Sequence, residues 1–173
     1  MSLPEDDSLL NYTLPLKSII DSLGLKDKKV KLLISKSRYT LTFIANDKPL
    51  KTYPVVFGPN PVDDKRMEGD GCTPEGIFGI RNMYPHKSWS KFIWIDYPNE
   101  ESWKKHRLSK QKGEIPETAT IGGEIGIHGV PEENDALIEG RINWTAGCIS
   151  LKTTDINELF DNISKSTKVE IIK

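Results

Sequence analysis

The stretch of residues 29–57 alternates apolar and polar side chains with a period of two, and this pattern constrains the fold more than any other. Successive side chains of a β-strand point to opposite faces of a sheet, so such alternation predicts strands with one buried face. The apolar positions of the first two runs are Val30, Leu32, Ile34, Tyr39, Leu41 and Phe43. A turn at residues 46–48 precedes a third run, residues 50–57, which ends at a Gly-Pro-Asn-Pro sequence. The segment therefore predicts three strands.

The remainder of the chain adds more strands than helices. Strands are expected over residues 76–83, 92–95, 125–130, 149–151 and 169–172. Helices are expected over residues 9–25 with Pro15 in the first turn, over part of 99–112, and from a cap at Thr153-Thr154-Asp155 through Ile163. We interpret the basic residues of 99–112 as a solvated helix face rather than a contact for an acidic polymer. The pattern favours a mostly-β (α+β) twisted sandwich with two or three small helices.

Bulk properties exclude several classes of protein. At 173 residues the chain has the size of one domain, and its formal net charge of −1 gives no preference for nucleic acid. No apolar run approaches the length of a membrane span. Two cysteines and three histidines predict neither a disulfide framework nor a zinc site. We expect two free thiols, no metal, no organic cofactor and a monomer.

Two short apolar runs carry the residues with the clearest chemistry. His128 lies in Ile-Gly-Ile-His-Gly, and Cys148 follows twenty residues later in Trp-Thr-Ala-Gly-Cys-Ile. A thiol has a pKa of about 8.5, so a nucleophilic cysteine needs a neighbouring base at neutral pH. His128 is the best-placed base, because the apolar residues before it predict a rigid strand. Cys148 can equally be a small buried hydrophobic residue, which is common for free cysteine.

Three ordered blocks of sequence extend beyond this pair. His128-Gly129 is followed, after fifteen residues, by Thr145-Ala146-Gly147-Cys148. The other blocks are residues 68–78, which contain Gly-Asp and Thr-Pro-Glu-Gly sequences, and residues 36–41, with a Lys-Ser-x-x-x-Leu pattern. Together they resemble the L,D-transpeptidase catalytic domain, the YkuD-type family. The resemblance implies a YkuD-like catalytic domain over residues 29–173, preceded by a tail and short helix over residues 1–28.

Two positions depart from the pattern of that family. Ala146 stands where most members have histidine, and Ser150 stands where most have arginine. The Trp-Thr-Ala-Gly-Cys-Ile form is similar to a subgroup that includes hydrolytic amidases of peptidoglycan-linked peptides. The resemblance implies acyl transfer on peptidoglycan stem peptides, after a diaminopimelate-type residue. The smaller side chains favour hydrolysis; a cross-linking L,D-transpeptidase and an inactive wall-peptide binding module are the alternatives.

The resemblance also implies a role for each residue of the site. Cys148 attacks the carbonyl carbon, and His128 takes the thiol proton while its second ring nitrogen contacts the backbone carbonyl near Gly129. Backbone N–H groups around Ala146 and Gly147 form the oxyanion hole, so alanine is tolerable at 146 but Gly147 is not replaceable. If Cys148 and His128 act as a thiolate–imidazolium pair, we expect a bell-shaped pH dependence of activity.

The remaining candidates have weaker support. We name four residues as candidates for substrate binding: Arg141, Asn143, Trp144 and Thr145. Arg141 in particular is a candidate replacement for the missing arginine, since arginine pairs well with carboxylates. His86 and His106 are expected to be ordinary surface histidines, and Cys72 is expected to be structural.

The location of the protein follows from the implied substrate. The first residues are acidic and contain no apolar core of a secretory signal peptide. Peptidoglycan nevertheless lies outside the inner membrane. We therefore expect an exported protein, periplasmic or at the cell envelope, whose leader is absent from this sequence.

Overall fold

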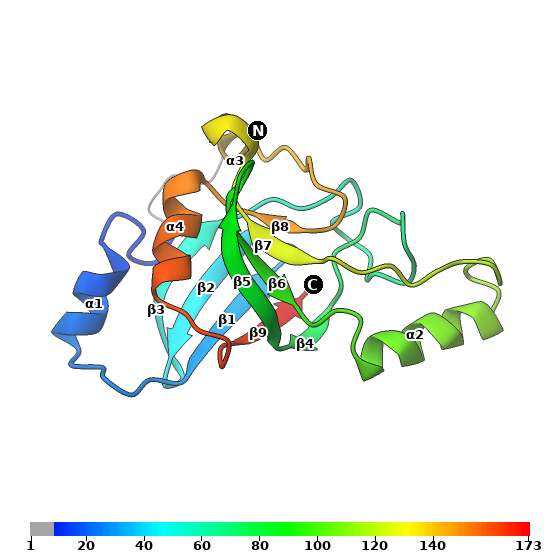
Figure 1. The fold of residues 1–173 in the computed structure, drawn as a ribbon, viewed down its shortest axis with the longest axis horizontal. Helices are drawn as coiled ribbons and strands as arrows, with labels where there is room; N and C mark the ends of the chain where they lie inside the picture. Colours follow the sequence, from blue (N-terminus) through cyan, green and yellow to red (C-terminus); the bar gives the residue numbers. More distant parts are fainter. Residues whose placement is uncertain (1–8) are drawn as a thin grey trace.

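Two β-sheets form the body of the protein in the computed structural model, which describes residues 9–173. The strands are β1 (Val30–Ser35), β2 (Thr40–Ala45), β3 (Lys48–Pro54), β4 (Gly76–Phe78), β5 (Ile80–His86), β6 (Ser90–Ile95), β7 (Gly126–His128), β8 (Ile149–Ser150) and β9 (Lys168–Ile172). The first sheet has the order β3-β2-β1-β9-β4, and the second has the order β5-β6-β7-β8 (Figure 1). The mostly-β expectation is confirmed.

The three strands predicted from the alternation in residues 29–57 are β1, β2 and β3, which pair as antiparallel neighbours. Their register sets Leu32 opposite Phe43 and Ile34 opposite Leu41, and all four side chains are buried. The period of two thus places one face of this sheet against the core. The last strand, β9, lies parallel to β1 and antiparallel to β4, in the interior of the sheet.

The single strand expected over residues 76–83 is wrong, because the chain changes sheets at Gly79. Strand β4 pairs with β9 in the first sheet, whereas β5 pairs with β6 in the second. At the crossing point the Gly79 N–H donates to the Asp96 carboxylate at 2.9 Å, and the Gly79 carbonyl accepts from the Asp96 N–H at 3.0 Å. Apolar residues occur on both sides of Gly79, so the sequence pattern does not reveal the change of partner.

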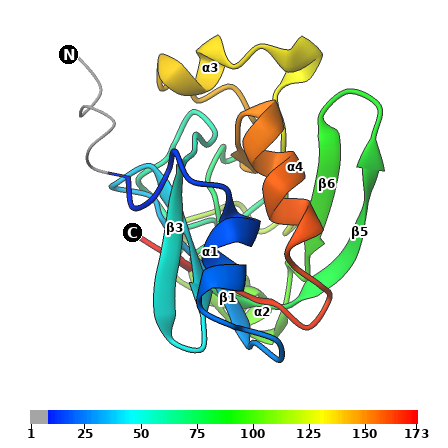
Figure 2. The same cartoon turned by 90° about the vertical axis from the view of Figure 1, so that its left-hand side faces the viewer.

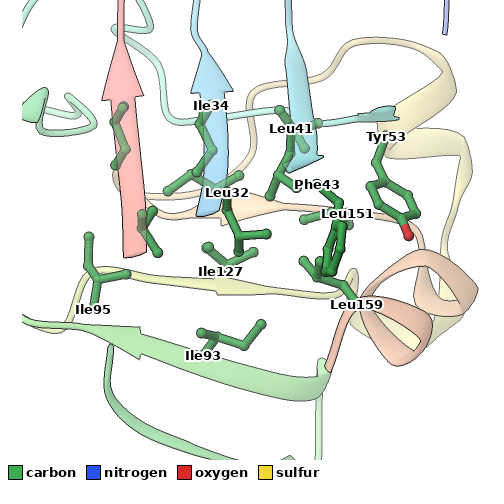
Figure 3. Close-up of a cluster of buried hydrophobic side chains, with 14 of the residues drawn as sticks. Leu32, Ile34, Leu41, Phe43, Tyr53, Ile93, Ile95, Ile127, Leu151 and Leu159 are labelled. Carbon is green, nitrogen blue, oxygen red and sulfur yellow. The ribbon is translucent and has the colours of Figure 1, made fainter. Parts of the chain in front are cut away.

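The two sheets face each other across one apolar core (Figure 3). The side chains labelled there are Leu32, Ile34, Leu41, Phe43, Tyr53, Ile93, Ile95, Ile127, Leu151 and Leu159. Burial of one such aliphatic side chain contributes about 1.5–3 kcal/mol. Ile127 belongs to β7 and is fully buried, so the core fixes the strand that carries His128.

The helices are α1 (Leu16–Ser22), α2 (Glu100–Gln111), α3 (Ala136–Glu139) and α4 (Thr153–Asp161). The helix expected over residues 9–25 is shorter than predicted, and Pro15 precedes it as the N-cap. The Leu16 N–H donates to Glu158 of α4 at 3.1 Å, which fastens the two helices together. Figure 2 shows α1 and α4 on the same side of the molecule, whereas α2 extends from the opposite end in Figure 1.

The cap expected at Thr153-Thr154-Asp155 is wrong, because the N-cap of α4 is Lys152, whose side chain makes no capping hydrogen bond. The Thr153 N–H instead donates to the Asp135 carboxylate at 3.0 Å. Asp155 lies in the first turn, as expected, and accepts a hydrogen bond from the Tyr12 hydroxyl at 2.7 Å.

Helix α3 is a further short helix that no sequence pattern predicted. No helix within residues 9–173 is long and apolar enough to cross a bilayer. Residues 1–8, the first part of the tail expected over residues 1–28, lie outside the described residues.

Candidate active site

His128 is the last residue of β7, and Cys148 directly precedes β8, the neighbouring strand of the second sheet. Strands β7 and β8 are parallel, with Ile127 opposite Ile149 and His128 opposite Ser150. Ile127 and Ile149 both point into the apolar core. Because side chains alternate along a strand, His128 points to the other face, and so does Cys148, which immediately precedes β8. The two residues singled out in the sequence therefore share one face of the sheet.

His128 is held by a backbone carbonyl and by aromatic rings. Its Nδ1 lies 2.8 Å from the carbonyl oxygen of Gly129, which only accepts, so Nδ1 carries the proton and Nε2 is left as an acceptor. The ring stacks on Trp89 with centroids 4.1 Å apart, and Trp144 meets it edge-on at 5.4 Å. The side chain is only 1% exposed. Burial lowers the pKa of His128 to about 4, although the bond to Gly129 opposes this shift.

Cys148 is half-buried, and its thiol points to the chain that enters β7. The Sγ atom donates to the carbonyl oxygen of Glu124 at 3.5 Å. Burial raises the pKa of the Cys148 thiol to about 11, against a smaller opposite effect of the Gly126 N–H and of the Lys65 ammonium. The resting thiol is therefore protonated at neutral pH.

The pKa shifts of His128 and Cys148 do not favour a thiolate–imidazolium pair in the resting site. An ion pair needs a raised pKa on His128 and a lowered pKa on Cys148, and burial shifts both in the opposite direction. Both groups are neutral at pH 7. A neutral imidazole with a free Nε2 is still the correct form for a general base.

This resting state predicts how the thiol reacts with an alkylating agent. With a pKa of about 11, the thiolate fraction of Cys148 is small at pH 7 and rises about tenfold per pH unit. The rate of alkylation by iodoacetamide should rise steadily from pH 6 to pH 10, without an inflection where histidine titrates. The measurement is made in a Cys72→Ala background by intact mass spectrometry. A plateau of fast alkylation already reached at pH 7 would instead indicate a preformed ion pair.

The loop before Cys148 is fixed by hydroxyl groups. Thr145 Oγ1 accepts from the Gly147 N–H at 3.2 Å and donates to the Cys148 carbonyl at 2.8 Å. From the neighbouring loop, Thr73 Oγ1 donates to the Gly147 carbonyl at 2.7 Å. Since the Gly147 N–H has this partner, the N–H groups of Ala146 and Cys148 are the better candidates for the oxyanion hole. Thr145 is buried and holds the loop in place.

The structure separates the other substrate-binding candidates. Trp144 contacts the His128 ring and lies at the site. Arg141 lies over the Tyr39 ring, with its guanidinium carbon 4.9 Å from the centroid. Asn143 accepts from the Phe57 N–H at 3.0 Å and donates to the Tyr39 hydroxyl at 3.0 Å. The side chains of Arg141 and Asn143 therefore have protein partners away from the thiol, which weakens their assignment to substrate.

The surface role expected for His106 is wrong, whereas His86 is partly exposed. His106 is buried, with Nδ1 2.6 Å from the Arg66 carbonyl oxygen. His86 is partly buried and stacks on the face of Trp89 at 4.4 Å, so that Trp89 lies between His86 and His128. Sequence reasoning missed Trp89 altogether, because its role depends on the hairpin between β5 and β6 rather than on a local motif.

The loop of residues 60–75 contacts the loop before Cys148 through Thr73, and its own conformation is held by carboxylates. Asp70 accepts from the Lys65 ammonium and from the backbone N–H groups of Arg66, Met67 and Cys72. These bonds outweigh burial and lower the pKa of Asp70. Cys72 is buried beside them, and burial raises the pKa of its thiol to about 11. Both cysteines carry free thiols, and Cys72 lies in a structural position. In residues 9–173 no three metal-binding side chains gather into a possible metal site.

The sequence matches the YkuD family, the L,D-transpeptidase catalytic domain, over residues 29–171. This match covers most of the chain, and the chain therefore belongs to that family. The family consists of enzymes that act on peptidoglycan. No curated protein matches the sequence.

Solved structures share the fold at low sequence identity. The helical cell shape determining protein Pgp2 from Campylobacter jejuni has a TM-score of 0.63 and 23% identity, over 91% of this chain and 55% of that one. Bd1075 from Bdellovibrio bacteriovorus has a TM-score of 0.58 and 19% identity, over 83% and 48%. L,D-transpeptidase 3 from Mycobacterium tuberculosis, in complex with a faropenem-derived adduct, has a TM-score of 0.55 and 12% identity, over 84% and 61%. The chain spans about half the length of the first two.

Proposed function

We propose that this protein is a cysteine-dependent enzyme that transfers or hydrolyses acyl groups of peptidoglycan stem peptides, after a diaminopimelate-type residue. The observation that carries the proposal is the arrangement of His128. Its Nδ1 donates to the Gly129 carbonyl, which leaves Nε2 as the acceptor. Cys148, directly before β8, is on the same face of the sheet as His128. This arrangement supports a role for Cys148 as the nucleophile and for His128 as a neutral general base.

The reaction begins from the neutral pair. The Cys148 thiol leaves the Glu124 carbonyl, Sγ attacks the carbonyl carbon of the scissile amide, and the thiol proton passes to His128 Nε2. The oxyanion that forms is stabilised by the N–H groups of Ala146 and Cys148. His128 then returns the proton to the departing amine, which leaves a thioester on Cys148.

Water or a second amine resolves the thioester, and this choice separates a hydrolase from a transpeptidase. Ala146 is exposed and small, so its side chain gives the thioester little shelter from water. Ser150, by contrast, is completely buried, and its small size does not open the site. We favour hydrolysis because of Ala146 and keep cross-linking as the alternative. An inactive module that only binds wall peptides is the third candidate.

The location and partners follow from this substrate. The proposed enzyme acts outside the inner membrane, in the periplasm or cell envelope, where peptidoglycan is found. Its substrate is a stem peptide or wall-linked peptide, and the monomer expected from the sequence is part of the proposal.

The experiment that tests the function separates the three candidates. Purified protein is incubated with a tetrapeptide muropeptide, with and without an excess of acceptor peptide, and the products are identified by mass spectrometry. We expect shortened monomer under both conditions. Cross-linked dimer as the main product with acceptor would establish the transpeptidase.

A carbapenem distinguishes the enzyme from the binding module. An active Cys148 opens the β-lactam ring and retains the whole molecule as a thioester, so the protein gains the mass of the carbapenem. The Cys72→Ala variant should gain the same mass as the wild type. Absence of both adduct and product would leave the binding module as the function.

A further inference from the structure

The Gly129 carbonyl that holds His128 has a second hydrogen-bond donor. Ser150 Oγ lies 3.2 Å from this oxygen and donates to it, and the indole N–H of Trp144 donates to Ser150 Oγ at 3.2 Å. With the 2.8 Å contact to His128 Nδ1, three hydrogen bonds join Trp144, Ser150, Gly129 and His128. Ser150 is completely buried. The chain of bonds lies entirely beneath the proposed reaction site.

Hydrogen bonds hold both the carbonyl and the N–H of Gly129. A carbonyl oxygen has two lone pairs, and here Ser150 engages one while His128 engages the other. The Gly129 N–H donates to the Trp89 carbonyl at 3.0 Å. A Cβ atom at Gly129 would lie 2.5 Å from that same oxygen, so the backbone has no room to shift toward Trp89.

We propose that Ser150 and Trp144 are positioning residues that set the direction of the Gly129 carbonyl and thereby the tautomer and orientation of His128. The inference rests on the proposed function, because a fixed tautomer matters only if His128 acts as the base. Trp144 acts twice: its N–H holds Ser150, and its ring meets the edge of His128. Ser150 thus contributes to the site through backbone geometry and never touches the substrate.

The alternative is that the serine only fills space in the sheet. An apolar residue of similar size would then serve as well, because Ile149 and Leu151 on either side are buried in the core. A hydroxyl that accepts from one group and donates to another has a different consequence. Its removal leaves the Trp144 N–H without this acceptor and leaves one lone pair of the Gly129 carbonyl open. The carbonyl can then turn, and the proton of His128 can move to Nε2.

The test reads the tautomer directly in the resting protein. The chain has three histidines, so the ring nitrogens can be followed by long-range ¹H–¹⁵N NMR after ¹⁵N-histidine labelling, with His128→Gln as the assignment control. The wild type should show protonated Nδ1 on His128. Ser150→Ala should shift a measurable share of the signal to the Nε2–H tautomer. Ser150→Thr, which keeps the hydroxyl, should restore the wild-type spectrum.

Kinetics give the second readout. In Ser150→Ala the rate of carbapenem acylation should fall about tenfold or more, a part of the 10²–10⁴-fold effect of a positioned base. Ser150→Thr should recover most of that rate. Trp144→Phe keeps an aromatic ring but loses the N–H, and should show a smaller loss in the same direction. If Ser150→Ala fails to fold, Trp144→Phe tests the same inference.

A matched control breaks a hydrogen bond between two hydroxyl groups in the first sheet. Thr42 Oγ1 and Thr52 Oγ1 lie 3.1 Å apart in the first sheet, far along the chain from the site, and Thr52→Val should change neither the tautomer nor the acylation rate. A wild-type tautomer and rate in both Ser150→Ala and Trp144→Phe would overturn the inference. The NMR readout uses no substrate. Failure of the proposed function on muropeptides is therefore distinguishable from failure of this inference.

Discussion

Replacement of Cys148 by alanine is expected to lower turnover of a stem peptide by at least about 10³-fold, because removal of a covalent nucleophile leaves only binding and oxyanion contributions. Without the thiol no thioester can form, and His128 has no thiol proton to accept. The measurement is the initial rate of product release from a tetrapeptide muropeptide at saturating substrate, followed by chromatography and mass spectrometry.

Two variants control for structural damage. Cys148→Ser keeps a donor for the Glu124 carbonyl and should fold normally, but a hydroxyl is a far weaker nucleophile than a thiol next to a neutral base. Cys72→Ala removes the other free thiol, which is also protonated at neutral pH, and should keep close to wild-type turnover. More than a tenth of wild-type turnover in both Cys148 variants would mean that another group performs the attack.

The three strands β1, β2 and β3 of the first sheet could be predicted from sequence because their pattern is local. Alternation in residues 29–57 specifies both the strands and the buried face, and the register confirms it. The split of residues 76–83 could not be predicted, since Gly79 changes sheets through its bonds to Asp96, which lies seventeen residues away. The cap at the start of α4 could not be predicted for a related reason. Aspartate is a common N-cap residue, yet the carboxylate of Asp155 accepts a hydrogen bond from Tyr12, which is far away in the sequence.

In the candidate site, too, part of the arrangement could be predicted from sequence and part could not. His128 and Cys148 stand out in the sequence because glycine and apolar residues surround them, and the structure places them on one face of the sheet. Their charge states could not be predicted, because they depend on burial that only the assembled fold creates. The contacts of Trp89 and Glu124 with the site also depend on the assembled fold. Trp89 acts through its ring, and Glu124 through its backbone carbonyl, so neither leaves a recognisable motif.

Replacement of Gly147 by alanine is expected to reduce kcat by about 10²–10³-fold, the effect of losing one oxyanion donor. Gly147 has φ of +138°, a conformation that side chains rarely adopt, and a Cβ there would lie 2.6 Å from the carbonyl oxygen of Cys72. That oxygen belongs to backbone and cannot move aside easily. The loop must therefore shift, and the flanking N–H groups of Ala146 and Cys148 move with it. The rate of acylation by a carbapenem measures the loss.

Gly123 provides the matched control for this substitution. It lies in the segment that leads into β7, its backbone is not in the left-handed region, and a Cβ there would meet no atom within 4 Å. Gly123→Ala should therefore keep wild-type acylation and the wild-type melting temperature. Gly147→Ala should have a lower melting temperature, since a strained backbone costs about 1–3 kcal/mol of folding free energy. If Gly147→Ala acylates as fast as Gly123→Ala, the loop tolerates the displacement, and the oxyanion donors must be sought outside residues 146–148.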